Sequence, residues 1–161
     1  MVAFSSSKLE RLRVMLVDDS PMMRELVQSV LESVGIKQFM AASDGRRALT
    51  QLPVFAPHLA FVDWEMEPMN GLDFVRAVRA LPDADNPYLP IIMLTSHAEA
   101  AWVVEAKNAG VHEYLIKPAS GGAILARLAS VINNPRPFVR TDGYFGPAAR
   151  SANAPRDVTG L

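Results

Sequence analysis

The chain has 161 residues, which suits one ordinary domain with some length to spare. Its formal net charge of −1 gives no general attraction to nucleic acid or to an acidic membrane surface, so we expect neither as a partner. The sequence contains no cysteine, which excludes disulfides and thiolate metal sites and favours a cytoplasmic setting.

Five short apolar runs recur along the chain, and each is followed by a polar residue. They are RVMLV before Asp18, QFMAA before Ser43, HLAFV before Asp63, PIIML before Thr95 and HEYLI before Lys117. Continuous apolar runs of this length are typical of parallel strands that are covered on both faces. We therefore expect five buried parallel strands.

Helical patterns separate these runs. The first has Ser20 as its N-cap, Pro21 at its first position and Gly35 as its stop. A second begins at the cap Asp44 and is expected to end before Pro53. Three more are expected at about 71–81, at about 99–109 and around 124–132. Strict alternation of strands and helices predicts a doubly wound α/β fold with a five-stranded parallel sheet.

The ends of the chain differ from this pattern. Residues 1–9 are expected to be an N-terminal extension without the apolar region of a signal peptide, and no later run approaches the length of about 18 apolar residues that spans a membrane. Residues 10–133 form the predicted domain. Residues 134–161 are rich in Pro, Gly and Asn and lack apolar periodicity, so we expect a tail, either flexible or docked on the domain through aromatic residues such as Phe138.

Polar residues at the strand ends predict a site. Asp18 and Asp19 follow the first strand, Asp63 the third, Thr95 the fourth and Lys117 the fifth. Because ligands bind at the carboxyl ends of parallel strands, we expect these side chains to converge there. Three carboxylates in one crevice raise one another's pKa values unless a cation lies among them, and Mg²⁺ or Mn²⁺ prefers such oxygen ligands.

The same residues suit phosphoryl transfer. An ionised Asp63 can attack phosphorus and form an acyl phosphate without a general base. Thr95 can donate a hydrogen bond to a phosphoryl oxygen, and Lys117 can neutralise another.

Four motifs in chain order then resemble the receiver domain of response regulators in two-component signalling, in particular the single-domain chemotaxis regulators. They are VDDS, VDWEMEPMNG, IIMLTS and YLIKP. The resemblance covers about residues 10–133 and implies a flavodoxin-like (βα)5 fold with strand order 2-1-3-4-5.

The resemblance also implies roles for individual residues. Asp19 would bind Mg²⁺ directly with help from Asp18, and the backbone carbonyl of Glu65 would be a further ligand. Asp63 would accept phosphate from a histidine kinase or a histidine phosphotransfer protein. Thr95, Lys117 and the aromatic switch residue Tyr114 would report the phosphoryl group, and the Lys117–Pro118 bond is usually cis in relatives.

Some residues depart from the family pattern or lie beside the site. Glu67 occupies a position where relatives commonly have proline, so we expect an altered loop. Glu65 and His97 stand two residues past Asp63 and Thr95, at positions that tune the lifetime of the phosphate. We hypothesise that the Glu65 carboxylate pairs with Lys117 or His97. Two aromatic residues, Trp64 and Trp102, are expected to be packing or rim residues.

The leading functional hypothesis is a stand-alone receiver, not an enzyme beyond its own phosphorylation and dephosphorylation, that signals to an unidentified downstream protein through a change in binding. A phosphorelay intermediate or phosphate sink would use the same site. An aspartyl-phosphate phosphohydrolase is disfavoured because Glu65 stands where such enzymes have a second Asp. A receiver-like scaffold that does not use phosphate is disfavoured because the expected site residues are all present.

Overall fold

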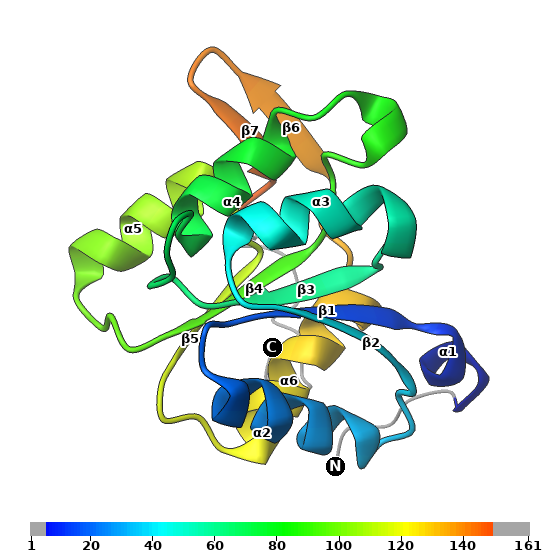
Figure 1. Ribbon diagram of the computed structural model, residues 1–161. Helices are drawn as coiled ribbons and strands as arrows, with labels where there is room; N and C mark the ends of the chain where they lie inside the picture. The colour runs from blue at the N-terminus through cyan, green and yellow to red at the C-terminus, as the bar shows by residue number, and fades with distance from the viewer. Residues whose placement is uncertain (1–5, 150–161) are drawn as a thin grey trace.

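The structure is a computed structural model that describes residues 6–149. A five-stranded parallel sheet forms its middle layer, in the order β2-β1-β3-β4-β5 (Figure 1). The strands are β1 (Arg13–Val17), β2 (Gln38–Ala42), β3 (Leu59–Val62), β4 (Ile91–Thr95) and β5 (Glu113–Ile116). The predicted fold class and strand order are confirmed.

Helices cover both faces of the sheet (Figure 1). On one face lie α2 (Pro21–Glu32) and α6 (Gly121–Asn133), together with the short helix α1 (Ser6–Arg11), which the sequence pattern did not predict. On the other face lie α3 (Gly45–Phe55), α4 (Gly71–Arg79) and α5 (Ala100–Ala109). Among residues 6–149, no helix combines the length and apolar character needed to cross a membrane.

Successive strand residues point to opposite faces, which explains the continuous apolar runs. Met15 and Val17 of β1 pack with α3, α4 and α5, whereas Val14 and Leu16 pack with α2 and α6. The strand therefore needs an apolar residue at every position.

The helix caps follow the sequence signals, with one error. Ser20 Oγ accepts a hydrogen bond from Met23 N, and Asp44 Oδ1 accepts from the backbone N–H groups of two residues in the first turn of α3. The prediction that this helix ends before Pro53 was wrong, because α3 continues to Phe55. Pro53 lies in the last turn, where its missing N–H removes one hydrogen bond but Ala56 N still donates to Leu52 O. The helix predicted at about 71–81 ends slightly earlier, at Arg79.

The region expected as a tail contains regular structure. Strands β6 (Phe138–Thr141) and β7 (Tyr144–Pro147) form an antiparallel hairpin beside the N-terminal end of β5 and the C-terminal end of α5 (Figure 1). Asp142 and Gly143 make its two-residue turn, and this dipeptide is a recognised hairpin signal. Residues 1–5 and 150–161, which belong to the expected N-terminal extension and tail, lie outside the described residues.

The hairpin is packed against the domain. The Phe138 ring lies under the guanidinium group of buried Arg79, at 5.0 Å, and makes an edge contact with Tyr88 at 5.2 Å. Close backbone approach requires glycine at Gly146, because a Cβ there would lie 2.9 Å from Gly110 Cα. Residues 138–147 thus pack against the domain as an ordered part of the fold.

Two histidines stand at strand starts and pair with the neighbouring strand. His58 donates its backbone N–H to Arg13 O and accepts from Arg13 N at Nδ1. His112 makes the same pair of hydrogen bonds with Ile91, at the start of β4. Both rings lie at the opposite end of the sheet from the acids that follow β1 and β3.

Candidate functional site

Three carboxylates meet where β1 and β3 end. Oxygens of Asp18, Asp19 and Asp63 lie within 4.8 Å of one another, and the first and last of these residues are buried. Asp18 Oδ1 accepts from Ser20 N at 2.9 Å, and Asp63 Oδ1 accepts from Trp64 N at 2.8 Å. These hydrogen bonds fix the direction of both buried carboxylates.

A glycine lets the chain return close to the third of these acids. A Cβ at Gly71 would lie 2.0 Å from the backbone oxygen of Asp63, and Gly71 N donates to Trp64 O at 2.8 Å. The interval of eight residues between Asp63 and Gly71 therefore has a structural reason. With glycine at this position, the β3–α4 loop can fold back closely over the end of the strand.

Lys117 lies among the acids. Its Nζ is 3.0 Å from Asp18 Oδ2 and 3.6 Å from Asp63 Oδ2. The side chain enters from the loop after β5, where Lys117 N donates to Thr95 O and the Lys117–Pro118 bond is cis. The sequence-predicted convergence of Asp18, Asp19, Asp63 and Lys117 is present in the structure.

The pKa of Asp63 is raised from its usual range to about 6. Burial is the main cause, and the charges of Asp18 and Asp19 add to it, while Lys117 and the Trp64 N–H oppose it. The remaining carboxylate repulsion is what a bound divalent cation would relieve. The donor set consists of carboxylate oxygens, which fits a hard ion.

Thr95 and Tyr114 are connected through the backbone of His97. Thr95 is fully buried at the end of β4, and its Oγ1 accepts from His97 N at 3.4 Å. The Tyr114 hydroxyl donates to His97 O at 2.7 Å. Burial raises the pKa of Tyr114 to about 12, with Glu99 and Asp63 contributing, so this hydroxyl remains a donor at neutral pH.

His97 also makes side-chain contacts at the edge of the site. Its Nε2 lies 2.6 Å from Glu65 Oε1, so Glu65 is paired with one of the two partners expected for it. The imidazole stacks on Trp102 of α5, with ring centroids 3.8 Å apart and planes inclined by 3°. Trp64 lies edge-on to Trp102 at 4.7 Å.

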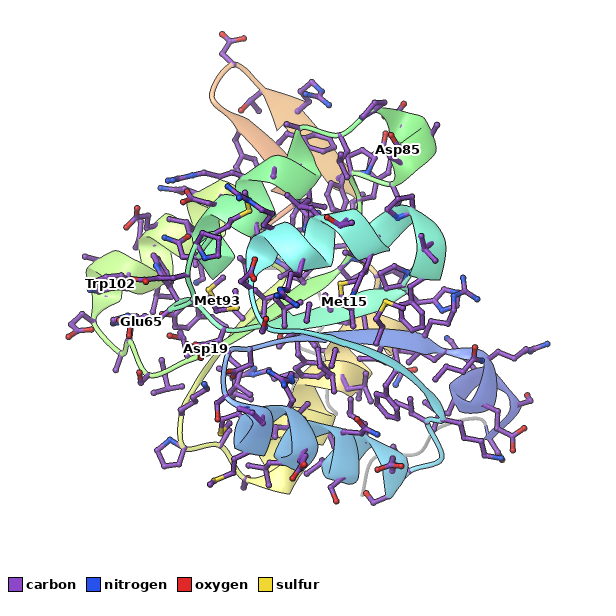
Figure 2. All side chains as sticks on the ribbon, viewed as in Figure 1. Met15, Asp19, Glu65, Asp85, Met93 and Trp102 are labelled. Atoms are coloured by element: carbon purple, nitrogen blue, oxygen red, sulfur yellow. The ribbon has the colours of Figure 1, made fainter. Side chains whose placement is uncertain are left out.

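Trp64, Glu65 and Trp102, but not His97, border an open hollow of about 560 Å³. It is lined by Asp19, Trp64, Glu65, Met66, Glu67, Asn70 and Trp102. In Figure 2, Glu65 and Trp102 lie at the same edge of the molecule as Asp19. Glu67, expected to alter the loop, precedes Pro68 in a cis peptide bond.

Sequence reasoning missed two contacts that support the site. Arg24 donates to the backbone oxygen of Asp18. Its place in the first turn of α2, close in sequence to the two acids, was a signal that could have indicated this contact. The stack of Trp102 on His97 has no sequence signal, because it depends on the path of the loop between β4 and α5.

Comparisons with known proteins agree with this geometry. A family sequence model described as "Response regulator receiver domain" matches residues 14–129. Chemotaxis protein CheY-3 of Vibrio cholerae is 30% identical over 122 residues, which cover 76% of this chain and 92% of that protein. Chemotaxis protein CheY1 of Helicobacter pylori is 35% identical over 124 residues, covering 75% and 97%. A solved structure of Vibrio cholerae CheY4 superposes with a TM-score of 0.69 at 31% identity, covering 75% of this chain and 98% of that one.

Proposed function

The chain belongs to the response regulator receiver domain family, and we propose on that basis that Asp63 accepts a phosphoryl group from a phosphohistidine donor. The observation that supports this most is the position of Lys117 Nζ, 3.0 Å from Asp18 Oδ2 and 3.6 Å from Asp63 Oδ2, within a cluster of three carboxylates. Such a site combines an ionised nucleophile with positive charge for an incoming dianion.

The acidic cluster is suited to a divalent cation. Receiver domains bind Mg²⁺ through an acidic pocket, and Asp18, Asp19 and Asp63 form such a cluster here. We assign Asp19, Asp63 and the backbone carbonyl of Glu65 as ligands of Mg²⁺ or Mn²⁺, with Asp18 helping to hold the ion. When bound, the ion neutralises phosphoryl oxygens during transfer.

The side chains of this site then have distinct tasks. A carboxylate oxygen of Asp63 attacks phosphorus, the P–N bond of the donor breaks, and the imidazole leaves with the bonding electron pair. Lys117 neutralises one oxygen of the transferred group, and the Thr95 hydroxyl donates to another. The Trp64 N–H holds the carboxylate in position.

The output of this reaction is a change in protein binding. The backbone of His97 connects Thr95 to Tyr114 through two hydrogen bonds. A movement of Thr95 toward a phosphoryl group would therefore shift this backbone and, with it, the Tyr114 ring. We assign the donor to a histidine kinase or a histidine phosphotransfer protein and the receiver of the signal to a separate protein. The cysteine-free sequence supports a cytoplasmic setting for this exchange.

The test is phosphorylation by phosphoramidate with Mg²⁺, followed by intact-mass measurement. Wild type should gain one phosphoryl group, and Asp63→Asn should gain none. Asp85→Asn is a matched control, because Asp85 is an exposed acid that lies across the molecule from Asp19 in Figure 2. Labelling of Asp63→Asn at the wild-type level, or no labelling of wild type, would overturn the proposal.

A further inference from the structure

Trp102 contacts the edge of the site without belonging to any of the motifs that define it. It lies on α5, and its indole is nearly coplanar with the His97 imidazole, with ring centroids 3.8 Å apart. It also makes an edge contact with buried Trp64, the residue whose N–H donates to Asp63. The indole thus touches the neighbours of both Asp63 and Thr95.

The His97 ring needs this support to keep its orientation. Its backbone is fixed by Thr95 Oγ1 and the Tyr114 hydroxyl, but these hydrogen bonds leave the side chain free to rotate. Its Nε2 lies 2.6 Å from Oε1 of Glu65, whose side chain is 69% exposed. An exposed side chain such as Glu65 holds a neighbour only weakly. The ring is therefore oriented mainly by the stacked indole of Trp102, with an edge contact from Trp64 at 5.8 Å beside it.

Glu65 lies at the edge of the acidic site, and the His97 ring lies against it. Glu65 and Trp102 line the same hollow as Asp19 (Figure 2). A water molecule that hydrolyses the aspartyl phosphate attacks phosphorus, the bond from phosphorus to the Asp63 oxygen breaks, and inorganic phosphate leaves while a proton passes to solvent.

We infer that Trp102 is a positioning residue that holds His97 against Glu65. In this position the two side chains restrict the approach of the hydrolytic water and so prolong the life of the phosphorylated state. This inference rests on the proposed function and extends it to a residue of α5. Trp102 acts through His97 and does not touch the reacting atoms.

The first test measures loss of the phosphoryl group from Asp63 after removal of the donor. Trp102→Leu removes the stack and should shorten the lifetime by about three- to tenfold, the factor to which one aromatic stack corresponds. Trp102→Phe keeps an aromatic face and should change the lifetime much less. Val104→Ala is the matched control, because Val104 is on the same helix and 53% exposed.

A double-mutant comparison separates positioning from a general structural effect. In a Glu65→Gln background, Trp102→Leu should have little further effect, because the pair it orients is already weakened. An equal shortening in both backgrounds, or an unchanged lifetime in the single variant, would overturn the inference.

A second readout needs no phosphate. The chain has two tryptophans, so each Trp102 variant leaves Trp64 as the sole indole fluorophore. Acrylamide should quench Trp64 more strongly in Trp102→Leu than in Trp102→Phe, and equal quenching contradicts the positioning role. This result is obtained even if wild type is not labelled, so failure of the inference is distinguishable from failure of the proposed function.

Discussion

His112 makes the stability of the domain depend on pH. Burial, with Arg79 and Arg136 nearby, lowers its pKa from 6.5 to about 3. The folded state therefore favours the neutral ring, whose Nδ1 accepts from Ile91 N. This contribution to stability is fully present above pH 6.5, the pKa of the ring in the unfolded chain. It is lost as the pH falls from 6.5 toward about 3, the pKa of the ring in the folded protein.

Wild type should accordingly lose about 2 kcal/mol of unfolding free energy between about pH 7.5 and about pH 5 through this residue. His112→Asn offers an acceptor oxygen in place of Nδ1 and does not titrate. Urea unfolding of both proteins at the two pH values measures the difference. The prediction fails if the variant loses as much stability as wild type over this interval.

The candidate site illustrates what residue patterns can and cannot predict. Asp18, Asp63 and Lys117 were predictable because each follows an apolar run, and parallel strands bring their carboxyl ends together. Glu65 had two possible partners in the sequence, and the path of the β3–α4 loop places it beside His97. The contact with Trp102 was not predictable, since it joins a loop to a helix face.

Among the elements, the β3–α4 loop depends on Gly71. Gly71→Ala would place a methyl group 2.0 Å from the backbone oxygen of Asp63, so the loop must move. We expect a loss of about 2–4 kcal/mol in unfolding free energy and at least a tenfold slower phosphorylation of Asp63. Gly143→Ala is the control, because a Cβ there meets no atom within 4 Å. Wild-type labelling and stability in Gly71→Ala would contradict this account.

Phe138 is one of the residues that attach the hairpin to the domain. This ring contacts the Arg79 guanidinium, Tyr88 and His112. Phe138→Ala should lower the unfolding free energy by about 1.5–3 kcal/mol, since the ring is only partly buried, while leaving Asp63 labelling intact. Val139→Ala, on the outward side of the same strand, should change it by about 0.5 kcal/mol or less. Calorimetric unfolding of the two variants compares them, and equal losses would show that Phe138 does not anchor the hairpin.

The errors at the element level have separate physical causes. Pro53 was expected to end its helix, but Leu52 and Phe55 pack against the core and keep the last turn helical. The hairpin was overlooked because its strands are only four residues long and β6 is mostly exposed, so they lack the apolar runs of the main sheet. Its Asp142–Gly143 turn was the usable signal.

For the whole molecule, alternation of strand and helix patterns predicted a parallel sheet covered on both faces, and the structure confirms it. The strand order came from the resemblance to receiver domains, since alternation alone is compatible with several orders. The family match covers residues 14–129, and the hairpin lies beyond it. Contacts made by residues beyond this match, such as Phe138 with Arg79, therefore had no family pattern from which to be predicted.

The histidines that begin β3 and β5 also bear on the fidelity of strand pairing. His58 reaches the amide of Arg13 only if β3 and β1 are aligned as observed, and His112 reaches Ile91 only under the same condition for β5 and β4. A slip of one residue would turn every side chain of a strand to the other face. It would carry the residues that follow the strand out of place as well. The hydrogen bond of each ring, at the opposite end of the sheet from the acids, therefore stabilises the strand alignment in which Asp63 and Lys117 lie close together.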